Sequence, residues 1–282
     1  MSSLARPWLV FVAVAFAMVL VDAADGSNFL GDVDDRLRNL QVSRLLETGR
    51  WFDPALPIIQ TPEVYLSPWS RLVDLPYAAL ALLFGTVMTP AAALHLAGLV
   101  WPVMLLAIFG WFAVSGMQAV AGRPRPMSST VVALSAVVMC FAVWEFSPGR
   151  TDHHNVQLVL MGMMLAGIAR WDRFGAVSCG AGAALSIIVG LECLPFVVVA
   201  FGGLALAFVA GFAGAAAFMA SAGVGLLTTV IAAGLVFAGP AALASVQCDA
   251  FSAAAWWLPC PPPCLLPLPP ISSRPAWQAP TR

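Results

Sequence analysis

Residues 89–117 read TPAAALHLAGLVWPVMLLAIFGWFAVSGM, a run that contains no charged side chain. A helix needs about 20 apolar residues to cross the hydrocarbon core of a bilayer, and this run exceeds that length. Similar apolar runs lie on both sides of it in the chain. Together with 89–117 they give seven expected spans, the others being Trp8–Val21, 128–146, 153–169, 175–192, 195–211 and 213–239. The sequence therefore predicts an all-α, polytopic transmembrane helical protein with about seven spans.

The composition supports the same class. Hydrophobic residues make up 61% of the chain and charged residues only 10%, and the mean hydropathy is +0.90. A soluble domain is about a quarter charged, so these values indicate a membrane protein. The net charge of -1 and the absence of a Lys/Arg run argue against nucleic acid as a partner. Val21-Asp22-Ala23-Ala24 weakly resembles a signal-peptidase site, so removal of the first run as a signal peptide is the alternative to a permanent span.

The longest hydrophilic stretch, residues 22–88, is expected to form a large first external loop. It carries nine of the 14 acidic residues. Within residues 34–46 the leucines lie near one helical face and the arginines toward another, which predicts an amphipathic helix on the membrane; the leucines are Leu37, Leu40 and Leu45. Residues 75–88 are apolar but reach only about 21 Å as a helix, against a bilayer core of about 30 Å. We therefore expect an interfacial or re-entrant helix there.

Two clusters of ionisable residues lie beside apolar runs. They are Gly31-Asp32-Val33-Asp34-Asp35 and Arg150-Thr151-Asp152-His153-His154. Charged groups beside hydrocarbon are costly, which marks both clusters as candidates for holding an ion or an anionic substrate. Only two expected spans separate the clusters, so they should face the same side of the membrane. Among the short loops, those of the opposite side carry Arg6, Arg123, Arg125, Arg170 and Arg173, whereas the short loop of the cluster side before residue 190 carries Arg150 alone, so the opposite side should be cytoplasmic. The clusters are then expected to face the periplasm or an equivalent exterior space.

Several ordered motifs resemble the bacterial branch of the oligosaccharyltransferase catalytic-subunit family. They are the Gly31–Asp35 cluster with Arg38, Gln41-Val42 and Leu45-Leu46, then Gly49-Arg50-Trp51-Phe52-Asp53-Pro54, Pro68-Trp69-Ser70-Arg71-Leu72-Val73-Asp74-Leu75-Pro76 and Gly149-Arg150-Thr151-Asp152-His153-His154-Asn155. The resemblance implies a C-type membrane glycosyltransferase domain over residues 1–257. It also implies an enzyme of the inner (plasma) membrane that transfers a sugar or oligosaccharide from a polyprenyl phosphate or pyrophosphate donor. The acceptor, a protein or a glycan, stays open.

The same resemblance implies a divalent metal that engages the pyrophosphate of the donor. In that family an aspartate of the first external loop and an Asp-x-His-like motif at the end of a later span hold the metal. Applied to this chain, it implies metal ligands at Asp34, Asp35, Asp152 and His154, and catalytic aspartates among Asp32, Asp34, Asp35 and Asp152. Which of the three loop aspartates is the catalytic one stays open. Mg²⁺ and Mn²⁺ both suit carboxylate oxygens, and Mn²⁺ accepts imidazole more readily. His153 is expected to face away from these ligands.

Substrate contacts are expected from arginines and from one further acid. Arg36, Arg38 and Arg150 can bind phosphate through the planar guanidinium fork, with ion pairing to a nearby acid or snorkelling as the alternative. Glu192 ends an apolar run and faces the cluster side by parity, so it is a candidate contact for the acceptor, an arginine or the outer shell of the metal.

Simpler roles compete with these assignments. Asp152 can serve only as a helix cap, and the loop aspartates can be a solvated surface. Asp53 and Asp74 are expected to be structural.

Two other functional classes remain open. A transporter or flippase-like protein also places polar clusters along its translocation path. The clusters here lie at the ends of spans rather than at the bilayer midplane, which favours the enzyme. A noncatalytic truncated scaffold is the third interpretation.

The chain changes character after Trp257. Residues 259–282 hold nine of the 22 prolines, a density that favours a polyproline-like or disordered tail over 258–282. The Trp-Trp-Asp acceptor-recognition motif of full-length relatives is not matched, because Leu258 follows Trp256-Trp257. We expect an aberrant ending, which would leave the donor and metal site without acceptor-recognition machinery.

Overall fold

The computed structural model describes residues 5–25, 32–122, 127–246 and 250–253. These residues form helices and connecting loops, and the β pairing among them is a single bridge between Ala55 and Leu66. The all-α prediction is therefore confirmed. The predicted Pro-rich tail, residues 258–282, lies outside the described residues.

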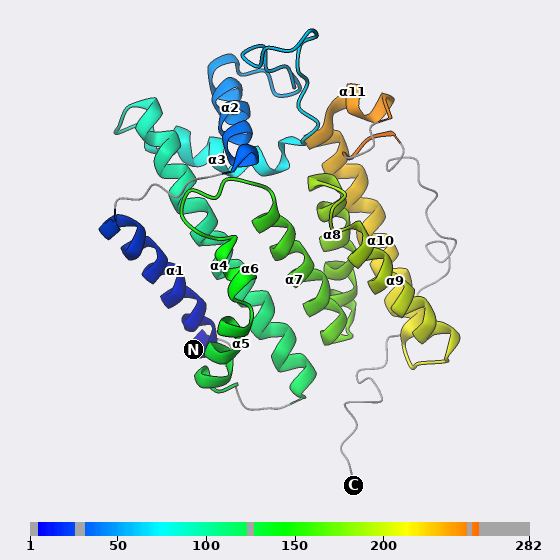
Figure 1. The fold of residues 1–282 in the computed structure, drawn as a ribbon. Coiled ribbons are helices and arrows are strands. Elements are labelled where there is room, and N and C mark those ends of the chain that lie inside the picture. Colours follow the sequence, from blue (N-terminus) through cyan, green and yellow to red (C-terminus); the bar gives the residue numbers. More distant parts are fainter. Residues whose placement is uncertain (1–4, 26–31, 123–126, 247–249, 254–282) are drawn as a thin grey trace. The chain divides into compact units, whose positions relative to one another are not determined.

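The helices in chain order are α1 (Ala5–Asp25), α2 (Val33–Thr48), α3 (Arg71–Phe84), α4 (Pro90–Ala121), α5 (Ser129–Val138), α6 (Cys140–Trp144), α7 (His154–Arg170), α8 (Arg173–Val189), α9 (Leu194–Val209), α10 (Ala215–Ala233) and α11 (Gly239–Ala244), with a π-helical turn (Gly234–Ala238) before α11 (Figure 1). By Cα proximity they fall into two compact units. The first contains Met1–Trp111 and Ser128–Val159, and the second contains Phe112–Met127 and Leu160–Arg282.

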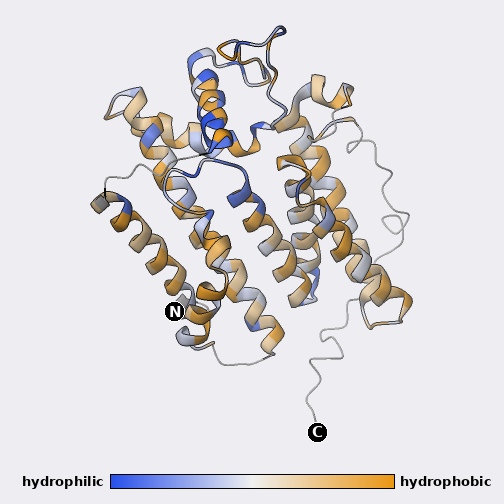
Figure 2. Cartoon of the chain, in the orientation of Figure 1, coloured by the Kyte–Doolittle hydropathy of each residue, from blue (hydrophilic) through white to orange (hydrophobic). Residues whose placement is uncertain are grey.

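Three of the described helical segments are long and apolar enough to cross a membrane, Pro7–Ala24, Pro90–Ala121 and Ala215–Ala244. The apolar helices α5, α8 and α9 are shorter. Figure 2 shows hydrophobic residues along most helices, whereas hydrophilic residues concentrate on α2 and on the segment that leads into α7. The chain is thus a helical membrane protein, and the count of seven spans stays a prediction.

The expected span at 128–146 is wrong as a single helix. It is divided at Met139, whose φ of −89° and ψ of 22° leave the helical range, into α5 and α6. The Ser135 hydroxyl donates to the carbonyl of Val131, a contact that bends helices because it competes with the backbone ladder. Residues 75–88 correspond to α3, whose 14 residues are too few to cross a core of about 30 Å.

In the first unit, α1 packs on α4 through aromatic side chains. Trp8 donates its indole N–H to the carbonyl of Ala107 at 2.6 Å, and the ring of Phe11 lies against Gly110. A Cβ at Gly110 would lie 2.3 Å from Cγ of Phe11, so only glycine permits this approach. The loop after α6 is tied to the same helix, because the Gly149 N–H donates to the Gly98 carbonyl at 3.1 Å. That contact ties the loop before residues 150–153 to α4.

The face of α2 that packs inward combines polar and apolar residues. Its buried residues are Asp35, Arg38, Gln41, Val42 and Leu45, and Leu40 is exposed. Arg38 has no exposed surface. Of the predicted leucine face only Leu45 is buried, because ion pairs with distant parts of the chain also bring polar residues inward; the location of α2 on the membrane stays a prediction.

The second unit is built on close contact between α8 and α10. A Cβ at Gly180 would lie 1.9 Å from the carbonyl oxygen of Ala222, and a Cβ at Gly225 would lie 2.6 Å from that of Val177. Small residues let two backbones approach in this way, as is usual for helices inside membranes. Trp171 caps the packing by stacking on Phe218, with ring centroids 4.6 Å apart.

Candidate functional site

The first acidic cluster forms the beginning of α2. Asp32 is the N-cap residue, and its Oδ1 accepts the backbone N–H groups of Asp34 and Asp35, each at 3.0 Å. In return, Oδ2 of Asp35 accepts the Asp32 N–H at 3.0 Å, which completes a capping box. Aspartate suits this position because its oxygen satisfies free N–H groups and its charge complements the helix dipole. The cluster is therefore an ordered structure rather than a solvated run of charges.

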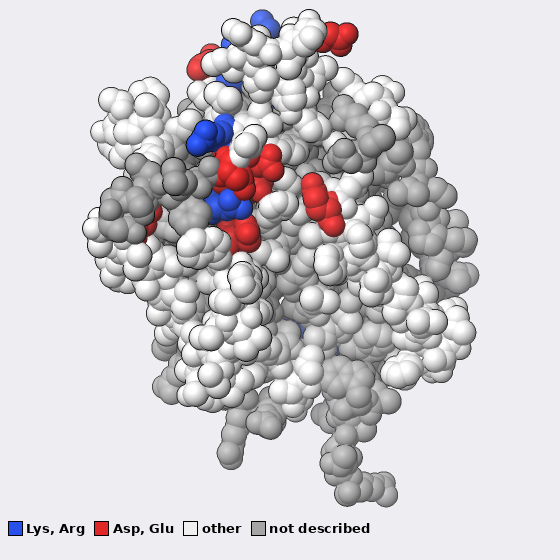
Figure 3. Space-filling view, viewed as in Figure 1, with Lys and Arg blue, Asp and Glu red and all other residues white. Residues whose placement is uncertain are grey.

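The second cluster docks directly on this helix start, so the structure brings the two predicted clusters together. The Asp152 N–H donates to Oδ1 of Asp35 at 2.8 Å, and the Thr151 hydroxyl donates to the Asp35 carbonyl at 3.0 Å. Arg150 adds an ion pair, with Nη1 2.8 Å from Oδ2 of Asp32. Figure 3 shows acidic and arginine side chains lying against one another on the face in view. The sequence-based expectation that the clusters are neighbours is confirmed.

Arg150 is the central cation of the site. Its Nη1 also lies 3.1 Å from Oδ2 of Asp35, and its Nη2 lies 2.7 Å from Oε2 of Glu145. Burial alone would lower the pKa of Arg150, but the hydrogen bonds to Glu145 and Asp32 raise it above its ordinary value. Burial raises the pKa of Asp35, whereas at Asp32 it is outweighed by the hydrogen bonds from the Asp35 N–H and Arg150, which lower the pKa. Sequence reasoning missed Glu145, whose signal was a single acid at the end of an apolar run.

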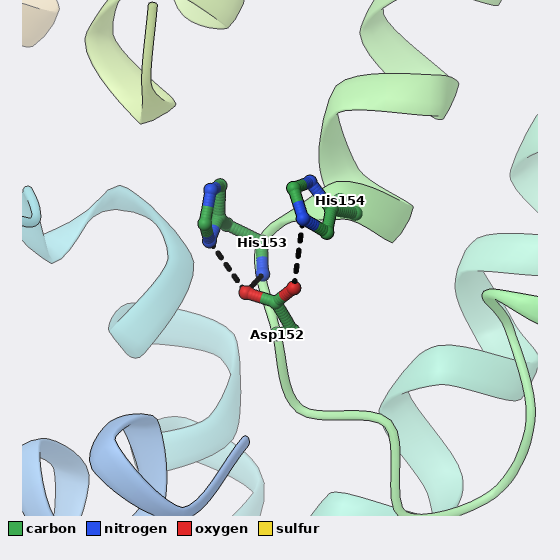
Figure 4. A group of neighbouring side chains, drawn as sticks. All are labelled: Asp152, His153 and His154. Atoms are coloured by element: carbon green, nitrogen blue, oxygen red, sulfur yellow. Dashed lines mark hydrogen bonds and ion pairs between the residues drawn. The ribbon is translucent and has the colours of Figure 1, made fainter. Parts of the chain in front are cut away.

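Asp152 lies between two imidazoles (Figure 4). Its Oδ1 is 2.5 Å from Nδ1 of His153, and its Oδ2 is 3.3 Å from Nε2 of His154. The prediction that His153 faces away was wrong: His153 is 3% exposed, and its ring packs on Trp69 with centroids 5.4 Å apart. Burial would raise the pKa of Asp152, but hydrogen bonding to His153 and the charges of both histidines lower it to about 2. The Asp152 side chain is thus ionised over the physiological pH range.

Asp152 also accepts the His153 N–H at 2.6 Å, immediately before α7 begins at His154. The capping interpretation and a ligand role therefore coexist in this residue. Asp152 is 2% exposed, and its Oδ2 accepts no hydrogen bond from the described residues, although Nε2 of His154 lies 3.3 Å from it. A buried carboxylate oxygen that lacks a donor is costly unless a cation or a water supplies the missing contact.

The described residues offer two groups of side chains that can hold a metal ion. The first group is Asp32, Asp34 and Asp152, and the second is Asp152, His153 and His154; within each group the ligand atoms lie within 4.8 Å of one another. The first set of oxygens suits a hard cation such as Mg²⁺ or Mn²⁺, and imidazoles favour Mn²⁺ over Mg²⁺. The donor chemistry therefore fits a divalent cation. Asp35 belongs to neither group, because its oxygens accept hydrogen bonds from backbone N–H groups and from Arg150.

A buried polar network below the clusters holds α2 against α3. Asp74, which is fully buried, accepts hydrogen bonds from Arg38 at 2.7 Å, Gln41 at 2.6 Å and Arg71 at 2.8 Å. The guanidinium of Arg38 also lies over the ring of Trp69, 4.4 Å from its centroid. Trp69 in turn contacts His153, so the network extends to the histidines. Arg38, expected to bind phosphate, instead serves this packing, and the structural role expected for Asp74 agrees with the contacts.

Two further residues, Arg36 and Glu192, were predicted to contact substrate. Arg36 is exposed on α2, where it remains available to a ligand. Glu192 is exposed between α8 and α9 in the second unit. Its place relative to the two clusters stays a prediction.

Comparison of the chain with known protein families, curated proteins and solved structures found no match.

Proposed function

We propose that the chain is a membrane glycosyltransferase that takes a sugar or oligosaccharide from a polyprenyl phosphate or pyrophosphate donor, with a divalent cation held by the two clusters. The acceptor lies on the external face of the inner membrane in this proposal. The observation that supports it best is the meeting of Asp32 and Asp34 with Asp152, from positions more than 110 residues apart in the chain, around a carboxylate oxygen that lacks a hydrogen-bond donor.

Each part of the site has a role suited to an anionic lipid-linked donor. Asp32, Asp34 and Asp152, together with His154, would hold the cation, which when bound would stabilise negative charge on the leaving phosphate. Asp35 fixes the loop by accepting the Asp152 N–H, and so sets the position of the neighbouring ligand. Arg36, exposed on the first turns of α2, is positioned to contact phosphate oxygens beside the cation.

The location of the clusters also supports an enzyme of the bilayer surface. They lie at the beginnings of α2 and α7; hydrophilic residues concentrate on α2 and on the segment that leads into α7, while α7 itself is apolar (Figure 2). A donor with a polyprenyl chain would keep that chain in lipid and present its phosphate groups to the loop. A soluble nucleotide-sugar would need no such arrangement.

The test is cation-dependent binding of a fluorescent polyprenyl-pyrophosphoryl sugar to the purified chain in lipid nanodiscs, followed by fluorescence anisotropy. Binding should require Mn²⁺ or Mg²⁺, be abolished by chelation, and weaken at least tenfold in Asp152→Asn, because a ligand to the cation is lost. Asp172→Asn is the matched control, since Asp172 caps α8 and pairs with Arg170. Binding that is indifferent to the cation would favour the transporter interpretation. No binding under any condition would refute the donor assignment.

A further inference from the structure

One guanidinium in the first unit pairs with three acids. Nη1 of Arg150 is shared by Asp32 and Asp35, and Nη2 is held by Glu145. The Arg150 side chain is only 11% exposed, and its partners range from the buried Asp35, at 2%, to Asp32, at 49%. Arginine suits this task because its planar fork presents several donors in fixed directions.

Both oxygens of Asp32 have partners in this arrangement. Oδ1 accepts two backbone N–H groups of the capping box, and Oδ2 is paired with Arg150 at 2.8 Å. Oδ1 cannot be released without uncapping α2, which leaves Oδ2 as the atom that can bind a cation. A divalent cation at Oδ2 and the Arg150 guanidinium would repel each other at contact distance. They therefore compete for the same oxygen.

We infer that Arg150 is a built-in counter-ion, which occupies Oδ2 of Asp32 until a divalent cation displaces it. Glu145 keeps Nη2 during this exchange, so the guanidinium stays beside the site and its freed Nη1 becomes a donor for an anion bound to the cation. Binding of the cation therefore also frees the Arg150 N–H group that would donate to a phosphate oxygen. Arg150 acts in this way as a positioning residue. This inference rests on the cation site of the proposed function.

A second consequence concerns the empty site. Without Arg150, the carboxylates of Asp32, Asp35 and Glu145 would lie close together, with Asp35 buried away from solvent, and their mutual repulsion would oppose the assembly of the loop. Arg150 reduces that repulsion, so the clusters stay assembled before the cation arrives. Arg150 thus keeps the two clusters assembled before the cation binds and leaves Oδ2 of Asp32 when it does.

The competition can be measured by Mn²⁺ binding alone, followed by loss of the electron paramagnetic resonance signal of free Mn²⁺ in nanodiscs. Arg150→Gln should bind Mn²⁺ about tenfold more tightly than the wild type, because the competitor for Oδ2 and its charge are removed. Arg150→Lys keeps the charge but cannot bridge Asp32 and Glu145 together, so it should also bind more tightly, by about threefold. Arg50→Gln is the matched control, since Arg50 is exposed and pairs only weakly with Asp53 at 3.8 Å.

A double-mutant cycle separates competition at one oxygen from a general electrostatic effect. In an Asp32→Asn background the Arg150→Gln change should no longer tighten Mn²⁺ binding, because the contested carboxylate is gone. Equal tightening with and without Asp32 would overturn the inference, as would unchanged or weaker binding in both Arg150 variants. If Arg150→Gln does not fold, the Arg150→Lys result decides. Absence of Mn²⁺ binding in the wild type would instead refute the cation site itself, so the two failures are distinguishable.

Discussion

Replacing Asp74 by asparagine should destabilise the first unit strongly. Asp74 has no exposed surface and receives hydrogen bonds from Arg38, Gln41 and Arg71. The neutral amide would leave two guanidinium groups, 1% and 6% exposed, without their shared counter-ion. Removing one partner of a buried ion pair costs about 3–5 kcal/mol, a large part of the roughly 5–15 kcal/mol that stabilises a typical protein. At about 2–4 °C per kcal/mol, the midpoint of thermal unfolding should fall by about 6–20 °C.

The assay is thermal unfolding in detergent, followed by tryptophan fluorescence, because Trp69 lies over Arg38 and should report the local change. Asp53→Asn is the matched control, from the segment between α2 and α3. Its carboxylate pairs with the exposed Arg50 at 3.8 Å, and exposed pairs contribute about 0–1 kcal/mol, so the midpoint should fall by less than about 4 °C. Adding Arg38→Met to Asp74→Asn should recover part of the loss, because it removes one uncompensated buried charge. Equal shifts in Asp74→Asn and Asp53→Asn, or a further loss on adding Arg38→Met, would refute the reasoning.

Three further predictions concern the cation ligands, the topology and the packing of the second unit. Asp152→Asn and His154→Gln should each weaken Mn²⁺ binding at least tenfold. The double variant should lose less affinity than the product of the two effects, because both side chains act on one ion. If Mn²⁺ titration shows that the two effects simply multiply, the residues do not share one ion. The topology can be tested with single cysteines, after the native cysteines have been replaced. Cysteines at the exposed positions Val33 and Val87 should react with an impermeant thiol reagent from outside, while one at Ala121 should not. Protection of the Val87 position alone would show that α3 crosses the bilayer. Gly180→Ala should lower the thermal midpoint of unfolding because its Cβ would lie 1.9 Å from the Ala222 carbonyl oxygen, whereas Gly202→Ala, which meets no atom within 4 Å, should leave the midpoint unchanged or raise it.

The apolar helices and the meeting of the two clusters were within reach of the sequence. Long uncharged runs such as 89–117 identify helices directly, because the bilayer imposes both length and composition. The parity of the expected spans was enough to place Asp32 and Asp152 on one side, and the contacts between their neighbours agree. The division of 128–146 at Met139 was not foreseeable from a glycine or proline, since neither occurs near the break.

The inward face of α2 and the orientation of His153 were beyond sequence reasoning. Arg38 and Gln41 read as surface residues, because their partner Asp74 is 36 and 33 residues away and no local pattern reveals the pairing. The expectation that His153 faces away from the ligands Asp152 and His154 had no long-range contact to guide it. Its buried position depends on Trp69, which approaches from the loop before α3. Long-range ion pairs and ring contacts, rather than periodicity, decided both cases.

The polar residues on the inward face of α2 also impose an order of events during synthesis. Asp35 is satisfied by the N–H of Asp152, which is added to the chain 117 residues later. At about 5–20 residues per second, translation needs about 6–23 s to supply that partner. Until then α2 has a charged face that water must solvate, so it cannot settle against the rest of the first unit. The clusters are therefore assembled late, by the arrival of residues 150–153, and a nascent chain shorter than this should expose α2 to proteases while its first apolar helices are already in the membrane.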